Sequence, residues 1–317
     1  MSDLAERLAS ILACPQTHQP LRADNGALVS DFAHRTFKPN PFGYFDFTLN
    51  DVFYDMETTS EAYADEQQAS WERYYREFLR PWIDREGAKR VLEVGSGLGM
   101  GIRMALADGY DAYGLDIPCL AKFWQSIQND PAHFLCGDGA AMPFPDGYFD
   151  ALYTLGVIEH IGTKVGHYTL EPNYWQTRLA FAKELLRVTR PGGRILITCP
   201  NKRFPIDIHH EPTDAATPQG AMRFRRWFFD KYGMTLHKTF GTYHLFSLGE
   251  LRRAFVIENG AQEICPLSMK NCFAFKRTGS LPLVKLAKTL ITGYIENMPA
   301  SLHGTFLNPF LVVEVRR

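Results

Sequence analysis

The stretch VLEVGSGLG, residues 91–99, decides the fold. A run of β-type residues that contains Glu93 leads directly into three glycines at alternate positions, Gly95, Gly97 and Gly99. Glycine permits a tight strand-to-helix turn and lets the backbone approach a ligand closely. The dinucleotide-binding pattern G-x-G-x-x-G needs a glycine where Met100 stands, so the spacing disfavours a nicotinamide cofactor and an oxidoreductase.

Around this stretch, β-type runs alternate with helical ones. The five runs are RVLEV, DAYGLD, HFLCGD, FDALYTLG and RILITCP, and alternation of this kind predicts βαβ units. Further on we expect a helix over 247–259, a possible strand over 263–269 and a last strand over 310–317. The predicted fold is a doubly wound, Rossmann-like α/β domain. Its mostly parallel seven-stranded sheet has an antiparallel last strand, and a small β-rich segment precedes it.

Two acidic residues end the second and third β-type runs. Asp116 and Asp138 should both lie at the carboxyl edge of the sheet, where ligands of such folds bind. A carboxylate after the second strand can accept hydrogen bonds from ribose hydroxyls, and one after the third can accept the exocyclic amine of adenine. Each could instead be a solvated loop acid.

At this point the chain resembles the class I S-adenosylmethionine methyltransferases, specifically the small-molecule group that includes ubiquinone and menaquinone methyltransferases. The resemblance spans residues 90–201, with VLEVGSGLG, LDI, GDGAAMPFPDGYFDALYTLGVIEHI and LLRVTRPGGRILITCPN in the family order. It implies S-adenosylmethionine as cofactor and S-adenosylhomocysteine as product. The residues that it implies for cofactor binding are Glu93, Gly95, Ser96, Gly97, Gly99, Asp116, Ile117, Asp138, Gly139 and Leu155. Glu93 and the glycines would hold the methionine end, Asp116 the ribose, and Asp138 with Gly139 the adenine.

The first 57 residues form an accessory segment ahead of a methyltransferase domain over 58–317. This segment resembles the zinc ribbon that often precedes such enzymes, with a departure from its C-P-x-C and C-x-x-C pattern. Cys14 is kept, but Thr17, Ser30 and Ala33 stand at the other ligand positions. A metal-free hairpin is favoured, and no metal is expected. The six cysteines are scattered singly, which favours reduced thiols over a disulfide framework.

Methyl transfer needs the acceptor atom aligned behind the methyl group, and a base only where the acceptor must lose a proton. Glu159 and His160 follow the fourth β-type run and are the predicted catalytic residues, with His160 as the first candidate base. The alternative is that both residues cap a short helix and shape the pocket.

Two insertions lie outside the repeating pattern, over 200–245 and 273–307. The first contains Asp207, His209 and His210, which we expect to contact the substrate because acceptor sites commonly lie on loops at this edge. Adjacent histidines point apart and no third ligand is evident, so a metal site is not favoured.

The segment MRFRRWFFDKYG, residues 222–233, mixes basic and aromatic side chains. It could stack on nucleic acid or bind a phosphate or lipid head group. The favoured interpretation is a helix with a packed aromatic face and a solvated basic face.

With 34 basic and 35 acidic residues the net charge is −1, which provides no overall field for steering toward nucleic acid or an anionic membrane. The start lacks the features of a signal peptide and no apolar run reaches spanning length, so we expect a cytoplasmic protein without a membrane span. The predicted function is methyl transfer to a small-molecule or lipid-linked acceptor. Oxygen is favoured over carbon or nitrogen as the methylated atom. Alternatives are a non-catalytic S-adenosylmethionine-binding partner subunit and an RNA or protein methyltransferase. The oligomeric state is left open.

Overall fold

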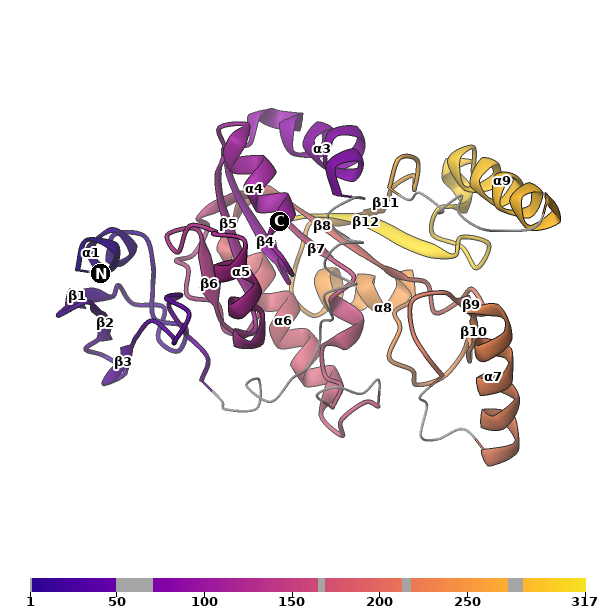
Figure 1. The fold of residues 1–317 in the computed structure, drawn as a ribbon, viewed down its shortest axis with the longest axis horizontal. Coiled ribbons are helices and arrows are strands. Elements are labelled where there is room, and N and C mark those ends of the chain that lie inside the picture. Colours follow the sequence, from indigo (N-terminus) through magenta and orange to yellow (C-terminus); the bar gives the residue numbers. More distant parts are fainter. Residues whose placement is uncertain (1, 50–70, 165–168, 213–217, 273–281) are drawn as a thin grey trace.

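The computed structural model describes residues 2–49, 71–164, 169–212, 218–272 and 282–317 (Figure 1). In the sequence, Thr58 with Glu61 is a possible capping box, and Tyr63 is a candidate for an aromatic lid over the cofactor. These residues lie outside the described part of the chain, as does the proposed domain boundary at 57/58.

A seven-stranded sheet forms the centre of the fold, in the order β11-β12-β8-β7-β4-β5-β6. The strands are β4 (Arg90–Val94), β5 (Asp111–Asp116), β6 (Phe134–Cys136), β7 (Phe149–Leu155), β8 (Thr189–Pro200), β11 (Glu263–Pro266) and β12 (Phe310–Arg316). The strands from β6 to β8 are mutually parallel, whereas β12 runs antiparallel to both β8 and β11. The predicted fold class, including the antiparallel last strand, is confirmed.

Helices cover both faces of this sheet, so strand residues are buried on alternate sides. On one face, Leu92 packs in a core with Phe181 of α6 (Tyr174–Val188) and with the N-terminal segment. On the other, Val91 packs with Ile102 of α4 (Met100–Ala107) and with α5 (Ala121–Ser126). The near-continuous burial of β8 and β12 explains why their runs read as uniformly apolar.

Aromatic residues recur at helical spacing from Trp71 to Trp82, which predicts a helix, and a helix is present from Trp71. It continues through a wide turn over Tyr75–Leu79 into α3 (Arg80–Asp84) and a short turn over Arg85–Gly87. Tyr75 and Trp82 are 2% and 4% exposed, so the aromatic stripe belongs to the core.

The N-terminal segment contains α1 (Ser2–Ala9) and a meander of β1 (Arg22–Asp24), β2 (Ala27–Ser30) and β3 (Arg35–Phe37). Beyond it, Phe47 N–H donates to Cys136 O (2.8 Å) and Cys136 N–H donates to Phe45 O (2.9 Å). The segment therefore covers the outer edge of β6, which would otherwise present unpaired backbone groups.

The remaining elements surround the carboxyl edge and the far side of the sheet. They are a short turn over Ile158–His160, β9 (Ile206–Asp207), α7 (Gln219–Tyr232), β10 (Thr235–Leu236), α8 (Leu248–Arg252) with a wide turn over Arg253–Ile257, α9 (Pro282–Glu296) and a turn over Ala300–Leu302. Ser247 and Glu250 form a capping box at the start of α8. Within the described residues, no helix is both long and apolar enough to cross a membrane.

One expectation is wrong. The aromatic face of the helix over 222–233 was expected to pack against the core, yet Arg225 is the buried residue of α7. Phe224, Trp227 and Tyr232 remain about half exposed. The reason is that α7 lies outside the small β9-β10 pair at the edge of the molecule, so its outer face meets no described element (Figure 1).

Candidate functional site

The glycine loop joins β4 to α4 at the carboxyl edge of the sheet. Gly95, Gly97 and Gly99 have φ values of 79°, 53° and 76°, a region that side chains with a Cβ rarely adopt. A Cβ on Gly95 would lie 2.2 Å from Cγ2 of Val157, and one on Gly99 would lie 2.1 Å from Cε1 of Phe134. A Cβ on Gly97 would meet no described atom within 4 Å. Packing therefore requires two of the glycines, whereas Gly97 borders open space.

Asp116 ends β5 beside this loop. Its Oδ2 accepts a hydrogen bond from Gly97 N–H (2.6 Å) and its Oδ1 from Ile117 N–H (2.7 Å). Burial raises the pKa of Asp116 to about 6, against the opposing effect of these two hydrogen bonds. Each carboxylate oxygen keeps a lone pair with which to accept from a ligand.

Asp138 and Gly139 follow β6 at the same edge. Asp138 Oδ1 accepts from Ala140 N–H (2.8 Å), and burial raises the pKa of its carboxyl group. A Cβ on Gly139 would lie 2.5 Å from Cε2 of Phe181, so this glycine allows the close approach of α6.

Glu93 and Ser96 lie deeper. Glu93 is 1% exposed, its Oε2 accepts from Tyr153 Oη–H (3.2 Å), and burial raises its pKa well above the usual range. The Oγ of Ser96 is buried without a hydrogen-bond partner among the described residues. Buried hydroxyls normally have a partner, so this position suits a polar ligand atom or a water. Leu155 ends β7, half-buried at the same edge.

The structure thus brings together the ten residues predicted for the cofactor, because they lie at the carboxyl ends of the adjacent parallel strands β4 to β7. The roles assigned to them remain predictions.

A second group of side chains gathers beyond β7. Glu159 and His160 lie on the short turn after this strand, and Asp207 and His210 come from β9 and the residues after it. The His210 Nδ1 lies 2.7 Å from Asp207 Oδ2. The His210 ring is 5.2 Å from that of His160, centroid to centroid, and 5.2 Å from that of His244. Five ionisable side chains therefore converge from segments far apart in the sequence.

These groups differ in exposure. Glu159, Asp207, His210 and His244 are each at most 5% exposed, whereas His160 and His209 are open to solvent. His209 packs beside Phe310, with ring centroids 5.4 Å apart, and turns away from His210. The expectation that the adjacent histidines point apart is confirmed in this respect.

Their pKa values diverge. Burial lowers the pKa of His244 to about 2. Although part of His160 reaches solvent, burial of its ring beside His210, together with the charge of His210, lowers the pKa of His160 to about 4. Burial also acts against a charged His210, but its hydrogen bond to Asp207 prevails and the pKa of His210 is raised. Burial raises the pKa of Glu159 to about 7. Of the imidazoles of His160, His210 and His244, that of His210 has its pKa raised, whereas the other two have theirs lowered.

The sequence showed no third metal ligand beside His209 and His210, but the fold brings further donor atoms close to His210. The donor atoms of Glu159, His160 and His210 lie within 4.8 Å of one another, and so do those of Asp207, His210 and His244. The additional nitrogens come from distant segments, which sequence spacing could not reveal. The cluster could hold a metal ion, although the 2.7 Å contact between Asp207 and His210 has the length of a hydrogen bond and is too short for two ligands of one ion.

Two residues of this region were missed from the sequence. His244 lies just before Phe246, which pairs with Asn201 at the end of β8, and that bridge holds it at the sheet edge. Arg178 of α6 is 2% exposed and donates to the backbone carbonyls of Ile161 and His244. It therefore ties the turn after β7 to the segment that bears His244. A charged side chain on the buried face of a helix was the signal that could have identified it.

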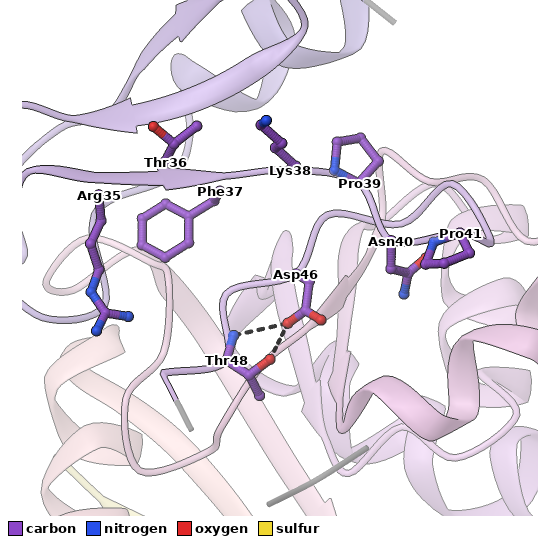
Figure 2. Close-up of a pocket in the computed structure, with 9 residues that line it drawn as sticks. All are labelled: Arg35, Thr36, Phe37, Lys38, Pro39, Asn40, Pro41, Asp46 and Thr48. Atoms are coloured by element: carbon purple, nitrogen blue, oxygen red, sulfur yellow. Dashed lines mark hydrogen bonds between the residues drawn. The ribbon is translucent and has the colours of Figure 1, made fainter. Parts of the chain in front are cut away.

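A separate open hollow of about 360 Å³ lies in the N-terminal segment (Figure 2). It is lined by β3 and the following loop, where Asp46 accepts a hydrogen bond from Thr48 N–H (2.9 Å). None of the predicted site residues lines it.

The central part of the sheet matches a known family. The family model of a methyltransferase domain matches residues 92–197. This chain is similar to that domain over 106 of its 317 residues. Its matched part runs from β4 to β8 and contains the glycine loop, Asp116, Asp138 and the turn with Glu159 and His160. The prediction of a class I methyltransferase is confirmed at this level, whereas the quinone-methyltransferase subgroup and the zinc-ribbon ancestry remain predictions.

Curated relatives match the methyltransferase domain over part of their length. A probable tRNA methyltransferase 9B from Mus musculus is 27% identical over 141 residues, covering 44% of this chain and 27% of the relative. A 2-methyl-6-phytyl-1,4-hydroquinone methyltransferase from Synechocystis is 33% identical over 132 residues, covering 38% of this chain and 36% of the relative. The chain therefore spans only about a third, or less, of these relatives. Among solved structures, a Haemonchus contortus phosphoethanolamine N-methyltransferase aligns with a TM-score of 0.45 and 14% identity, over 83% of this chain and 59% of that one.

Proposed function

We propose that this chain transfers the methyl group of S-adenosylmethionine to a hydroxyl group of a small-molecule or lipid-linked acceptor. The observation that carries the proposal is the glycine loop with Asp116, whose carboxylate lies beside the open space at Gly97. The name of the 2-methyl-6-phytyl-1,4-hydroquinone methyltransferase among the relatives supports an acceptor of this class.

The residues present fit the proposed cofactor. Ser96 offers a buried hydroxyl without a described partner, Gly97 leaves room for a ligand at the loop, and Asp116 keeps lone pairs for ribose hydroxyls. In this proposal Glu93 faces the methionine end, Asp138 with Gly139 the adenine, and Ile117 and Leu155 border the pocket. When bound, the sulfonium supplies an electrophilic methyl group, which an acceptor oxygen attacks in line as the carbon–sulfur bond breaks.

The histidine cluster would manage the acceptor's proton. Asp207 holds the Nδ1–H of His210, which fixes the tautomer and leaves Nε2 with a lone pair. We assign the base to His210, so that the hydroxyl proton passes to Nε2 as the carbon–oxygen bond forms. His160, the base predicted from the sequence, and His209 would line the approach of the acceptor from the solvent side.

The first test is calorimetric titration with S-adenosylhomocysteine. Asp116→Ala and Asp138→Ala should each weaken binding at least tenfold, about 1.4 kcal/mol, because each removes a charged acceptor. Asp31→Ala is the matched control, since Asp31 lies in an exposed ion pair with Arg22. A folded wild-type chain that does not bind the ligand would contradict the cofactor assignment.

The base assignment is tested without knowledge of the acceptor. In a histidine NMR titration, His210 should titrate above 6.5, while His160 and His244 should stay neutral to below pH 5. Asp207→Asn should lower the pKa of His210, because burial is then opposed only by the charge of Glu159. An unchanged pKa of His210 in that variant would remove Asp207 from its positioning role.

A screen of quinols, phenols and polyprenyl-linked alcohols then identifies the acceptor. If His210 is the base, kcat should rise with pH through the raised pKa of His210, since the neutral imidazole is needed. If His160 is the base, kcat should be flat down to about pH 5. If the enzyme methylates tRNA and none of these compounds, the RNA alternative is favoured. The name of the Mus musculus relative, a probable tRNA methyltransferase, is the reason to include tRNA in the screen.

A further inference from the structure

Helix α7 exposes a stripe of aromatic rings, which we call the α7 stripe: Phe224, Trp227, Phe228 and Tyr232. Phe224, Trp227 and Tyr232 are 53%, 50% and 49% exposed, and Phe228 is half-buried. Their spacing places all four on one side of the helix. A contiguous apolar surface of this kind usually marks an interaction site.

The four rings contact one another. Ring centroids are 5.7 Å apart for Phe224 and Trp227, and 4.8 Å apart for Phe228 and Tyr232. Because neighbouring rings partly cover one another, the stripe forms a continuous apolar ridge. The rings therefore leave little uncovered face on which nucleic-acid bases could stack.

Basic groups border this ridge. The helix carries one acidic side chain and four basic ones, of which Arg225 is buried and Arg226 Nη1 lies 2.6 Å from Glu211 Oε2. Arg223 and Arg226 are exposed, and the Lys231 ammonium lies 5.2 Å from the Trp227 ring centroid. A helix with aromatic residues on one face and Arg or Lys beside them is the composition that binds at the interface of an anionic bilayer.

We propose that α7 docks this chain on an anionic lipid surface, with the α7 stripe in the interface and the basic side chains at head-group phosphates. A second copy of the chain is disfavoured as the occupant, because a two-fold contact would set this basic helix against itself. RNA is disfavoured by the mutual coverage of the rings.

Helix α7 is joined to the histidine cluster. Beyond Gly233 the chain enters β10, where Thr235 pairs with Asp207 of β9. Arg225 Nη2 also donates to Tyr243 Oη (3.3 Å), next to His244. Docking would hold this cluster near the bilayer, and the further step to a lipid-linked acceptor rests on the proposed function. Figure 1 shows α7 at the edge of the molecule opposite the N-terminal segment.

The test is co-sedimentation of the full chain with phosphatidylcholine vesicles, with and without phosphatidylglycerol. We expect binding that requires phosphatidylglycerol and weakens with salt. Phe224→Ser and Trp227→Ser should each lower the partition coefficient about tenfold or more, and Arg223→Gln about fivefold. Phe32→Ser, which removes a 69% exposed ring from the N-terminal segment, is the matched control and should bind like wild type.

Tryptophan fluorescence locates the contact. Trp227 is exposed while Trp82 and Trp124 are buried, so brominated lipids should quench the emission of Trp227. Trp227→Phe should retain vesicle binding and lose this quenching. The proposal is overturned if wild type does not sediment with anionic vesicles, or if the stripe variants bind as well as it does. It is also overturned if wild type binds RNA or self-associates and Phe224→Ser abolishes that interaction while leaving vesicle binding unchanged. Since sedimentation needs neither cofactor nor acceptor, its failure is distinct from failure of the proposed function.

Discussion

Replacement of Gly97 by alanine separates the conformational cost of a glycine from its role at a ligand. Gly97 has φ +53° and Gly109, at the end of α4, has φ +88°, and a Cβ at either would meet no described atom within 4 Å. Both alanine variants therefore incur backbone strain without a clash, about 1–2 kcal/mol each. For a chain of this size, that cost lowers the melting temperature by only a few degrees. Gly97, however, borders the proposed cofactor, where a methyl group would occupy ligand space.

Two measurements on each variant test this reasoning. Thermal melts should place Gly97→Ala and Gly109→Ala within about 1 kcal/mol of each other. Calorimetry with S-adenosylhomocysteine should show at least tenfold weaker binding, about 1.4 kcal/mol, for Gly97→Ala and wild-type affinity for Gly109→Ala. The substitution keeps the backbone N–H that donates to Asp116, so a loss of affinity reports the added methyl group. Wild-type affinity in Gly97→Ala would refute the placement of the cofactor at this loop.

Three further outcomes are expected. Arg178→Met should destabilise the chain by about 2–4 kcal/mol, because the buried carbonyls of Ile161 and His244 lose their donor. Denaturant unfolding measures this loss, with Lys183→Met, at an exposed site on the same helix, as the control. Equal stabilities of the two variants would contradict a structural role of Arg178 in holding these two segments together. Affinity for S-adenosylhomocysteine should rise with pH through about 6, as the buried Asp116 carboxyl group ionises and can accept hydrogen bonds from ribose hydroxyls. Calorimetry at pH 5 and pH 7.5 should show a smaller difference in affinity for Asp116→Asn than for wild type. An equal difference in the variant would mean that another group causes the pH dependence. The triple variant Thr17→Cys, Ser30→Cys and Ala33→Cys places thiols beside Cys14 at the positions that a zinc ribbon uses for its ligands. It should bind Co²⁺ with a tetrahedral absorption spectrum that wild type lacks. Absence of that spectrum would contradict the ribbon ancestry.

The sheet could be predicted because its signal is local. Strands β4 to β7 are short apolar runs that end at Asp or are followed directly by Gly, and glycines such as Gly233 and Gly260 end helices with positive φ. The residues predicted for the cofactor lie together in this fold, since the carboxyl ends of neighbouring parallel strands meet at one edge.

The histidine cluster could be predicted only in part, because its members meet through tertiary packing. Glu159 and His160 follow directly from β7, but His244 reaches them through the pairing of Phe246 with Asn201. The aromatic face of α7 was misassigned for a related reason. Amphipathic periodicity shows that a helix has two faces, but not whether another element covers the apolar one.

The position of β12 has a consequence for folding during synthesis. Although it comes after the other strands in the sequence, β12 lies inside the sheet and makes the contact that joins β11 to β8. Until the ribosome has released residues 310–316, β8 has an open edge and β11 has no neighbour in the sheet. The nascent chain therefore exposes a long apolar strand over much of its translation, a state prone to aggregation that chaperones bind. Insertion of β12 between β8 and β11 joins residues far apart in sequence, and contacts of this kind form slowly.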